Sequence, residues 1–377
     1  MIATRTLRRA RILIVGCGDV GLRCAALLHS PRVFALTSQP ARVAPLREAG
    51  TIPVLGNLDV RASLARLAGL APVVLHLAPP ETSGEDDMRT RRLIAALSAR
   101  RRSAARPAGT GGRPLRANAA MTLRPGLHGA ARPHGTVLKA RTSVSAASFA
   151  PFGACVTRGP GCGKARHIVS EHPVGRVPLH ADRLRLVYAS TTGVYGDCQG
   201  ARIDETRPVR PANARAKRRV AAERLLRRAT ARGALVATIA RIPGIYAADR
   251  LPLARLAKGT PALVESDDVY TSHIHADDLA AIMVRLATHG RASRVIHACD
   301  DSELKMGAWF DRVADTFGVA RAPRVSRAEA EQRLDPVLLS FMRESRRLAN
   351  DRLRRELRMR LRYRTVDDFL RTLPPHP

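Results

Sequence analysis

Three glycines near the start of the chain have a spacing that suits the binding of a phosphate group. They follow a continuous apolar run, Arg11–Val15, and precede the helical pattern Leu22–His29. The first glycine permits a tight turn, the second lets the backbone approach a pyrophosphate, and the third lets a helix pack closely on a strand. The helix N-terminus then faces the anion. The predicted dinucleotide contacts are Gly16, Gly18, Asp19, Val20 and Gly21.

The end of the second apolar segment indicates which dinucleotide is bound. Val33–Leu36 reads as a strand, and Thr37, Ser38 and Arg42 follow it without an acidic residue. An acid at this place would bind the ribose hydroxyls of NAD. Hydroxyl groups and a guanidinium suit a 2′-phosphate, so NADP(H) is favoured over NAD(H). The alternative is that Arg42 is a solvated helix residue.

The elements that must position these residues alternate along the chain. Strands are expected at Arg11–Val15, Val33–Leu36, Ile52–Leu55, Val73–Leu77, Leu184–Ser190 and Leu235–Ile242. Helices are expected at Leu22–His29, Arg42–Ala49, Val60–Gly69, Met88–Arg100, Arg215–Arg232 and Leu348–Arg362. The last of these would bury Leu348, Leu353 and Leu357. This alternation predicts an α/β fold with a Rossmann-type, doubly wound parallel sheet.

Residues 99–181 have a different composition. This segment holds 14 Lys or Arg and one acid, Glu171, and 19 of its 83 residues are Gly or Pro. No hydrophobic period persists, so a mostly disordered insertion is expected. The alternative is a reading-frame error in a GC-rich gene. The predicted domains are a dinucleotide-binding domain over 9–250, interrupted by the insertion, and a smaller substrate-binding region over 251–377.

Four motifs resemble the extended short-chain dehydrogenase/reductases, the NAD-dependent epimerase/dehydratase group. They are Tyr188–Gly196, Arg241–Tyr246, His273–Asp278 and Glu344–Asn350. The resemblance covers residues 9–98 and 182–370. It implies an NAD(P)-dependent enzyme that reduces, epimerises or dehydrates a small, anionic or sugar-nucleotide substrate, and a homodimer formed through two helices. It adds Asp59, at the place of the adenine-contacting acid, and Ala78 to the predicted cofactor contacts. The alternative for Asp59 is a helix N-cap.

The resemblance also implies where catalysis would occur, and there the sequence departs from the family. A Ser/Thr, a Tyr and a Lys four residues later perform the chemistry in that group. Thr191 matches the Ser/Thr, whereas Arg215 and Arg219 stand where Tyr and Lys belong, in a register set by Glu223. An arginine keeps its proton, so Arg215 cannot be the acid or base.

Several roles remain open for these positions. Arg219 either replaces the ribose-binding lysine or joins Arg215, on the same helix face, in clamping a phosphate or carboxylate. Tyr195 and Tyr246 are candidate substitute acids. The function is therefore either that of an atypical oxidoreductase or epimerase, or that of a non-catalytic NADP(H)-binding sensor or scaffold.

Charge and cysteine content narrow the other classes of function. The net charge is +32, but 59 of the 64 basic residues are Arg, which is typical of a GC-rich genome. Nucleic-acid binding through the insertion and the basic tail is therefore less favoured. Six scattered cysteines indicate no disulfide framework. The lack of such a framework fits a reducing cytoplasm best, so we expect a cytoplasmic protein. No apolar run approaches the ~20 residues of a membrane span.

Three further patterns imitate other sites. Gly159–Lys164 resembles a phosphate-binding loop but is one residue short and lacks the Ser/Thr. A metal site is not expected at His273, His275 and Asp277, because the family resemblance makes them structural, with Asp277 or Asp278 capping the next helix. The remaining potential metal ligands are Cys155, Cys162, His167 and His172, in a segment that lacks packing residues.

Overall fold

The computed structural model describes residues 10–104 and 183–374, with the backbone alone over 100–104. Residues 105–181 of the expected insertion lie outside the described residues, as do the predicted loop Gly159–Lys164 and the cysteines and histidines between 155 and 172. Helix α3, Met88–Ala104, continues past residue 99, so regular structure extends further than the change in composition suggests.

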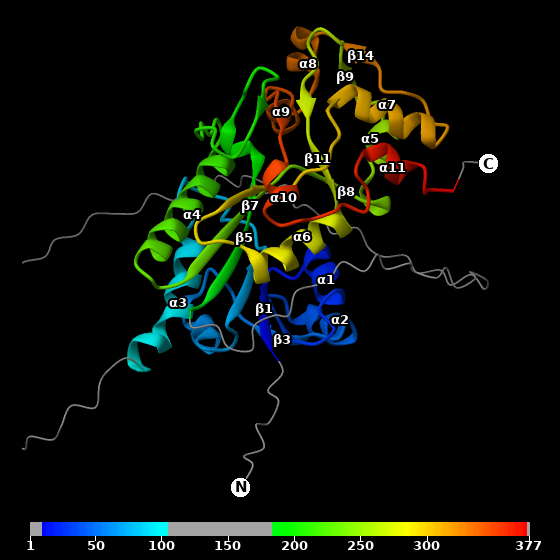
Figure 1. The fold of residues 1–377 in the computed structure, drawn as a ribbon. Helices are drawn as coiled ribbons and strands as arrows, with labels where there is room; N and C mark the ends of the chain where they lie inside the picture. Colours follow the sequence, from blue (N-terminus) through cyan, green and yellow to red (C-terminus); the bar gives the residue numbers. More distant parts are fainter. Residues whose placement is uncertain (1–9, 105–182, 375–377) are drawn as a thin grey trace, which may run out of the picture. The chain divides into compact units, whose positions relative to one another are not determined.

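Seven parallel strands form the central sheet, in the order β12-β7-β5-β4-β1-β2-β3 (Figure 1). The strands are β1 Arg11–Val15, β2 Arg32–Thr37, β3 Ile52–Leu55, β4 Val73–His76, β5 Arg185–Thr191, β7 Val236–Ile242 and β12 Val295–His297. The chain starts at the centre and winds first to one side and then to the other, which confirms the predicted doubly wound sheet. Its carboxyl edge therefore has a switch point between β1 and β4, where such sheets bind ligands.

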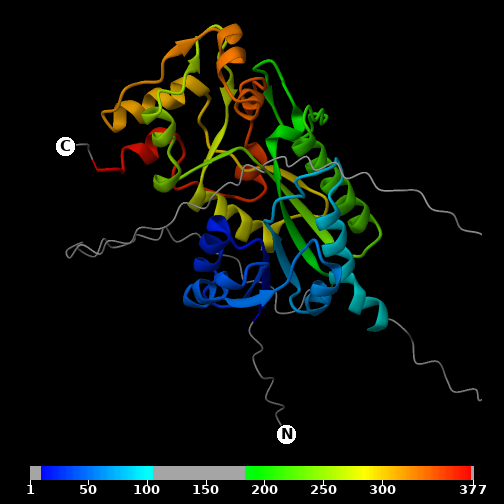
Figure 2. The same ribbon diagram turned by 180° about the vertical axis from the view of Figure 1, so that it is seen from behind.

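Helices cover both faces of this sheet, as the two opposite views show (Figures 1 and 2). Helices α1, Asp19–Ala26, and α6, Ala276–His289, pack on one face, whereas α3 and α4, Ala214–Ala231, pack on the other. Side chains of a strand alternate between faces. Accordingly, Ile12 and Ile14 of β1 belong to one hydrophobic cluster, and Leu13 and Val15 belong to the other.

Short elements connect and extend these layers. The remaining helices are η1 Pro40–Arg42, α2 Val43–Glu48, η2 Arg61–Leu67, η3 Thr192–Tyr195, η4 Ala248–Arg250, α5 Leu253–Ala257, α7 Met306–Thr316, α8 Arg327–Arg333, α9 Pro336–Phe341, α10 Asp351–Arg355 and α11 Val366–Leu370. Two-stranded pairs join β6 Arg202–Ile203 to β15 Arg347–Leu348, β8 Gly244–Tyr246 to β11 His273–His275, β9 Ala262–Leu263 to β14 Arg324–Val325, and β10 Tyr270–Thr271 to β13 Leu304–Lys305.

Three expected helices differ from those observed. The first begins at Asp19, directly after Gly18, because the glycine turn leads straight into it. The segment expected at Val60–Gly69 is a 3₁₀ helix, η2. The helix expected at Leu348–Arg362 is wrong, since only α10 is helical and Arg358 has a φ of 51°, which a helix interior does not allow. Its expected apolar side is nevertheless buried, at Leu348, Leu353 and Leu357.

The second half of the chain contributes to the same sheet. Strand β12 is its edge, and α6 packs against α1. A separate aromatic cluster surrounds Tyr246, Trp309 and Phe369. The predicted division near residue 250 stays an interpretation. In the described residues, no helix is long and apolar enough to cross a membrane.

Candidate cofactor and substrate site

The turn after β1 needs glycine at its first position. Gly16 has a φ of +85°, and a Cβ there would stand 2.5 Å from the backbone nitrogen of Ala78. The same nitrogen donates a 2.9 Å hydrogen bond to the carbonyl of Val15. The chain leaving β4 is therefore fixed against the chain leaving β1, and Ala78 contributes by closing this turn.

The next two glycines serve different purposes. A Cβ on Gly18 would meet nothing within 4 Å, so space is open directly before the N-terminus of α1. A Cβ on Gly21 would lie 3.2 Å from the sulfur of Cys17, which shows how closely α1 packs on β1. The neighbouring carboxylate of Asp19 is paired with Arg23 at 2.8 Å and with Arg250 at 3.0 Å. An open space before a helix N-terminus fits a pyrophosphate.

Arg42 reaches back to the glycine turn. Its Nη2 donates a 3.1 Å hydrogen bond to the carbonyl of Cys17. This side chain is therefore partly buried against the turn, and its contact with a 2′-phosphate stays a prediction. The hydroxyl of Thr37 accepts a 3.2 Å bond from the backbone of Gln39, and Ser38 is exposed next to it. The residues predicted from the end of β2 thus lie at the same edge as the turn.

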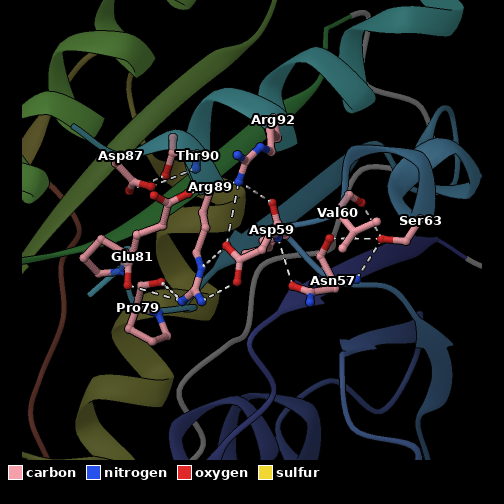
Figure 3. Close-up of polar contacts among 12 residues, drawn as sticks. Asn57, Asp59, Val60, Ser63, Pro79, Glu81, Asp87, Arg89, Thr90 and Arg92 are labelled. Carbon is pink, nitrogen blue, oxygen red and sulfur yellow. Dashed lines mark hydrogen bonds and ion pairs between the residues drawn. The ribbon is translucent and has the colours of Figure 1, made fainter. Parts of the chain in front are cut away.

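Asp59 is held by two arginines of α3 (Figure 3). Nε and Nη2 of Arg89 donate to its two carboxylate oxygens at 2.8 and 2.6 Å, and Arg92 lies 3.8 Å away. The bonds from Arg89 lower the pKa of Asp59. Arg89 also donates to the carbonyls of Pro79 and Pro80, each at 3.2 Å. This network joins the loop after β3 to the loop after β4.

The helix-cap interpretation of Asp59 is wrong. Val60 is the N-cap of η2, and no side chain caps that helix. The polar turn before it is made by Asn57, whose Oδ1 accepts a 2.9 Å bond from the backbone of Asp59 (Figure 3). The prediction that Asp59 contacts the cofactor stays a prediction.

Sequence reasoning missed a buried chain of hydrogen bonds at the start of α3. Asp87 accepts bonds from the backbone and hydroxyl of Thr90, at 3.0 and 2.8 Å, and Nε2 of His76 lies 2.9 Å from the same hydroxyl. Burial lowers the pKa of His76 to about 3, so its ring is neutral. An Asp three residues before a Thr at a helix start was the available signal. These hydrogen bonds fix the loop between β4 and α3.

Thr191 and Arg219 both have contacts at the carboxyl end of β5. The hydroxyl of Thr191 accepts a 3.3 Å bond from the backbone of Gly193. Nη1 of Arg219 donates to the carbonyl of Ala189 at 2.6 Å and to the hydroxyl of Tyr188 at 3.1 Å. Burial raises the pKa of Tyr188 to about 12. Arg219 therefore follows the strand edge, with its other nitrogens available to a ligand.

Arg215 lies in a different direction. Its guanidinium carbon stands 4.4 Å from the ring centre of Phe341 on α9, a cation–π contact. Among the described residues, no hydrogen bond or ion pair joins this guanidinium to another side chain. Burial lowers its pKa, and the positive charge of Arg219 lowers it further, whereas Glu344 raises it. The two arginines thus do not form a ready-made clamp, because each contacts a different element.

Glu344 is the site residue that sequence reasoning did not single out. Its Oε2 lies 3.8 Å from the point where a Cβ on Gly193 would stand. Arg346 donates to that oxygen at 2.8 Å, and Asn213, the N-cap of α4, donates to Oε1 at 3.3 Å. The side chain is 10% exposed. The sequence did contain a signal for this residue, the motif Glu344–Asn350, but that motif indicated only the family resemblance.

A buried ion pair holds α4 against the sheet. Glu223 accepts bonds from Nε and Nη2 of Arg241, at 3.1 and 2.7 Å, and from the hydroxyl of Ser190 at 2.7 Å. All three residues are buried. Glu223 therefore fixes the face of α4 that meets β5 and β7. The same residue set the register of the motif comparison in the sequence.

The two candidate substitute tyrosines have partners in the core. The hydroxyl of Tyr195 is 2.5 Å from Nε2 of His297, and that of Tyr246 donates to Asp300 at 3.1 Å. Their exposed fractions are 1% and 2%. Burial raises the pKa of Tyr195 to about 12. Both hydroxyls are therefore engaged away from Arg215.

The histidines that imitate a metal triplet serve the core and a helix cap. Nδ1 of His275 accepts a 3.2 Å bond from the backbone of Asp277 and so caps α6. Burial lowers the pKa of His273 to about 4. Asp278 accepts bonds from the backbone of Arg362 and Tyr363, at 2.7 and 3.0 Å. The expectation that Asp277 or Asp278 caps the helix is wrong, since the cap is a histidine. The described residues contain no cluster of three metal-ligating side chains.

Comparisons with known proteins agree with this architecture. The NAD dependent epimerase/dehydratase family model matches residues 177–299. No curated protein matches the sequence. A functionally unknown conserved protein from Silicibacter pomeroyi is 21% identical over 96% of this chain and 97% of its own, with a TM-score of 0.62. A nucleoside-diphosphate-sugar epimerase from Pseudomonas aeruginosa is 14% identical over 96% and 95%, with a TM-score of 0.62.

A third similar structure was solved with ligands. It is a double mutant of a dTDP-glucose 4,6-dehydratase from Streptomyces venezuelae with NAD and DAU bound, 17% identical over 96% of this chain and 95% of its own, with a TM-score of 0.59. At these identities the likeness concerns the fold. Residues 177–299 are therefore similar to the NAD dependent epimerase/dehydratase family, and the fold of the described residues is similar to that of these solved structures.

Proposed function

We propose that the chain binds NADP(H) or NAD(H) at the switch point between β1 and β4 and acts as an atypical oxidoreductase or epimerase. The glycine turn is the observation that carries this proposal. Gly16 is compelled by its positive φ and by Ala78, whereas Gly18 leaves open space before α1. Nothing in the packing requires glycine at residue 18, so an approaching ligand is the physical reason for it. When bound, a nicotinamide dinucleotide supplies hydride transfer.

Arg42 supports a preference for NADP(H). Its hydrogen bond to Cys17 brings a guanidinium to the glycine turn after β1. The segment that follows β2, Ser38–Arg42, offers no acid for ribose hydroxyls. Guanidinium groups bind phosphates through paired donors. Thr37 and Ser38 supply hydroxyls at the same edge. Arg219 would take the place of the family's ribose-binding lysine, because it lies along the end of β5.

The substrate is proposed to be a small anionic compound, in the class of the sugar nucleotides. Thr191 would hold its reacting oxygen. Arg215 supports the proposal that the substrate is anionic, because its guanidinium makes no ion pair within the described residues. One similar structure, 16% identical with a TM-score of 0.59, was solved in complex with UDP-glucose and NAD. The homodimer implied by the resemblance stays a prediction.

A second function, that of a non-catalytic NADP(H)-binding sensor or scaffold, is favoured by one observation. Arg215 cannot exchange a proton. This candidate keeps the dinucleotide site and dispenses with turnover.

Calorimetric titration of the purified full chain with NADPH and then NADH tests the proposal. We expect binding of one dinucleotide per chain, with NADPH the tighter. Turnover of UDP-glucose, UDP-glucuronic acid or dTDP-glucose with the bound dinucleotide then separates the enzyme from the sensor. A folded protein that binds neither dinucleotide would contradict both functions.

A further inference from the structure

We propose that Glu344 is the acid/base residue of this site and exchanges a proton with a hydroxyl group of the substrate. The inference rests on the proposed function, because the reaction needs a dinucleotide as hydride donor or acceptor. Arg215 occupies the position of the usual tyrosine and keeps its proton. A titratable group must therefore come from another element, and the segment after α9 provides one.

The position of Glu344 suits this role. Its Oε2 and the Oγ1 of Thr191 each lie 3.8 Å from the point where a Cβ on Gly193 would stand. Both oxygens therefore border the position that a side chain on residue 193 would fill, at the carboxyl end of β5. In the proposed reaction the absence of a side chain on Gly193 leaves this space to a substrate group. A hydroxyl held by Thr191 would lie within reach of a carboxylate there.

Two donors hold the carboxylate in place. Arg346 donates to Oε2 at 2.8 Å, and Asn213 donates to Oε1 at 3.3 Å. A carboxylate has about four lone-pair positions, so each oxygen still has room for a further proton. Asn213 also caps α4 through a 2.9 Å bond from the backbone of Ala216. The carboxylate is thus tied to the helix that carries Arg215.

Other titratable groups near this space are engaged elsewhere. Oδ1 of Asp197 accepts bonds from the backbones of Gln199 and Ser345, at 3.0 and 2.8 Å. The thiol of Cys198 is buried and points to the carbonyl of Gly196 at 3.9 Å, and burial raises its pKa. The charged groups that act on Glu344 are therefore Arg346 on its own segment and Arg215 on α4, and Asp197 binds the backbone of the next residue, Ser345.

The proposed step balances for an alcohol substrate. The O–H bond breaks and its proton goes to Glu344. The C–H bond breaks, and its electron pair leaves as hydride to the oxidised nicotinamide dinucleotide, so that the carbon becomes a carbonyl. Reduction is the reverse. Arg215 would meanwhile bind a carboxylate or phosphate of the same substrate.

The test compares Glu344→Gln with Glu331→Gln. Glu331 is a matched control, because its exposed carboxylate pairs with Arg343 at 2.8 Å and has no described contact with Thr191 or Glu344. The probes are UDP-glucose, UDP-glucuronic acid and dTDP-glucose with NADP⁺ or NAD⁺, and products are separated by chromatography. We expect Glu344→Gln to lower kcat about 100-fold or more, with dinucleotide affinity unchanged. Glu331→Gln should retain wild-type kcat.

A pH profile separates proton transfer from a structural role. In Glu344→His, the acidic limb of kcat/KM should move to higher pH, because imidazole titrates higher than a carboxyl group. If Glu344→Gln does not fold, Glu344→Asp should retain the acidic limb with a lower kcat. Wild-type kcat in Glu344→Gln overturns the inference, as does a wild-type protein that binds the dinucleotide but converts none of the probes. A folded protein that binds no dinucleotide overturns the proposed function itself.

Discussion

The turn after β1 and the start of α4 border the same sheet edge but are specified in opposite ways. At the turn, close contacts of the backbone and of neighbouring side chains leave room only for glycine at residues 16 and 21, whereas a Cβ on Gly18 would contact none of the described residues. At α4, Arg215 contacts α9 and Arg219 contacts β5. The predicted cofactor half thus has the glycine spacing of a dinucleotide turn, whereas in the predicted substrate half Arg215 and Arg219 stand where the resemblance implies a tyrosine and a lysine. The proposed function therefore needs a titratable group from another element.

The largest effect is expected at the turn. Gly16→Ala would place a Cβ 2.5 Å from the nitrogen of Ala78 at a φ of +85°. Strain and overpacking together should cost about 4 kcal/mol of unfolding free energy, with dinucleotide binding lost. Gly50→Ala is the control, since its φ is +76° but nothing lies within 4 Å. It should cost about 1 kcal/mol and leave binding intact. Urea denaturation and calorimetry measure both, and equal costs would refute the close approach.

The stability of the α4 region should depend on the buried ion pair between Glu223 and Arg241. Glu223→Gln leaves Arg241 buried beside a neutral partner and should cost about 3 kcal/mol. The exposed pair of Asp315 and Arg321, 2.7 Å apart, provides the control. Asp315→Asn should change stability by less than about 1 kcal/mol. Denaturation curves that rank the two substitutions equally would show that Glu223 does not anchor α4.

A smaller effect should separate the two dinucleotides. Arg42→Gln removes the guanidinium at the turn and should weaken NADPH about tenfold, or about 1.4 kcal/mol, with little change for NADH. Arg47→Gln, on the exposed side of α2, is the matched control. Equal losses for NADPH and NADH, measured by calorimetry, would mean that Arg42 only holds the turn.

The smallest effect concerns pH and lies far from the turn. Burial raises the pKa of Asp300 to about 8, whereas the unfolded chain titrates near 4. The folded protein binds this proton more tightly than the unfolded chain does. The free energy of unfolding should therefore fall as pH rises from about 4 to about 8. Asp300→Asn should make the free energy of unfolding less dependent on pH over this range. An unchanged slope in denaturation at pH 5 and pH 8 would show that Asp300 does not cause it.

The sequence predicted those parts of the molecule that depend on local patterns. Six strands and the glycine turn were readable because buried parallel strands are continuous apolar runs and glycine positions reflect backbone needs. Strand β12 has only three residues, Val295–His297, and gives no such run. The contacts of Arg89 with Asp59, and of Glu344 with Asn213, join residues remote in sequence. No spacing rule encodes such pairs, because the fold alone brings them together.

The most direct test of the account is a titration of NADPH into wild-type protein and Gly18→Ala, with unfolding free energies measured in parallel. A Cβ on Gly18 touches nothing in the protein, so stability should change by less than about 0.5 kcal/mol. The same Cβ would occupy the space proposed for the pyrophosphate, so NADPH affinity should fall at least about tenfold. Equal NADPH affinity in the two proteins would contradict a dinucleotide site at this turn.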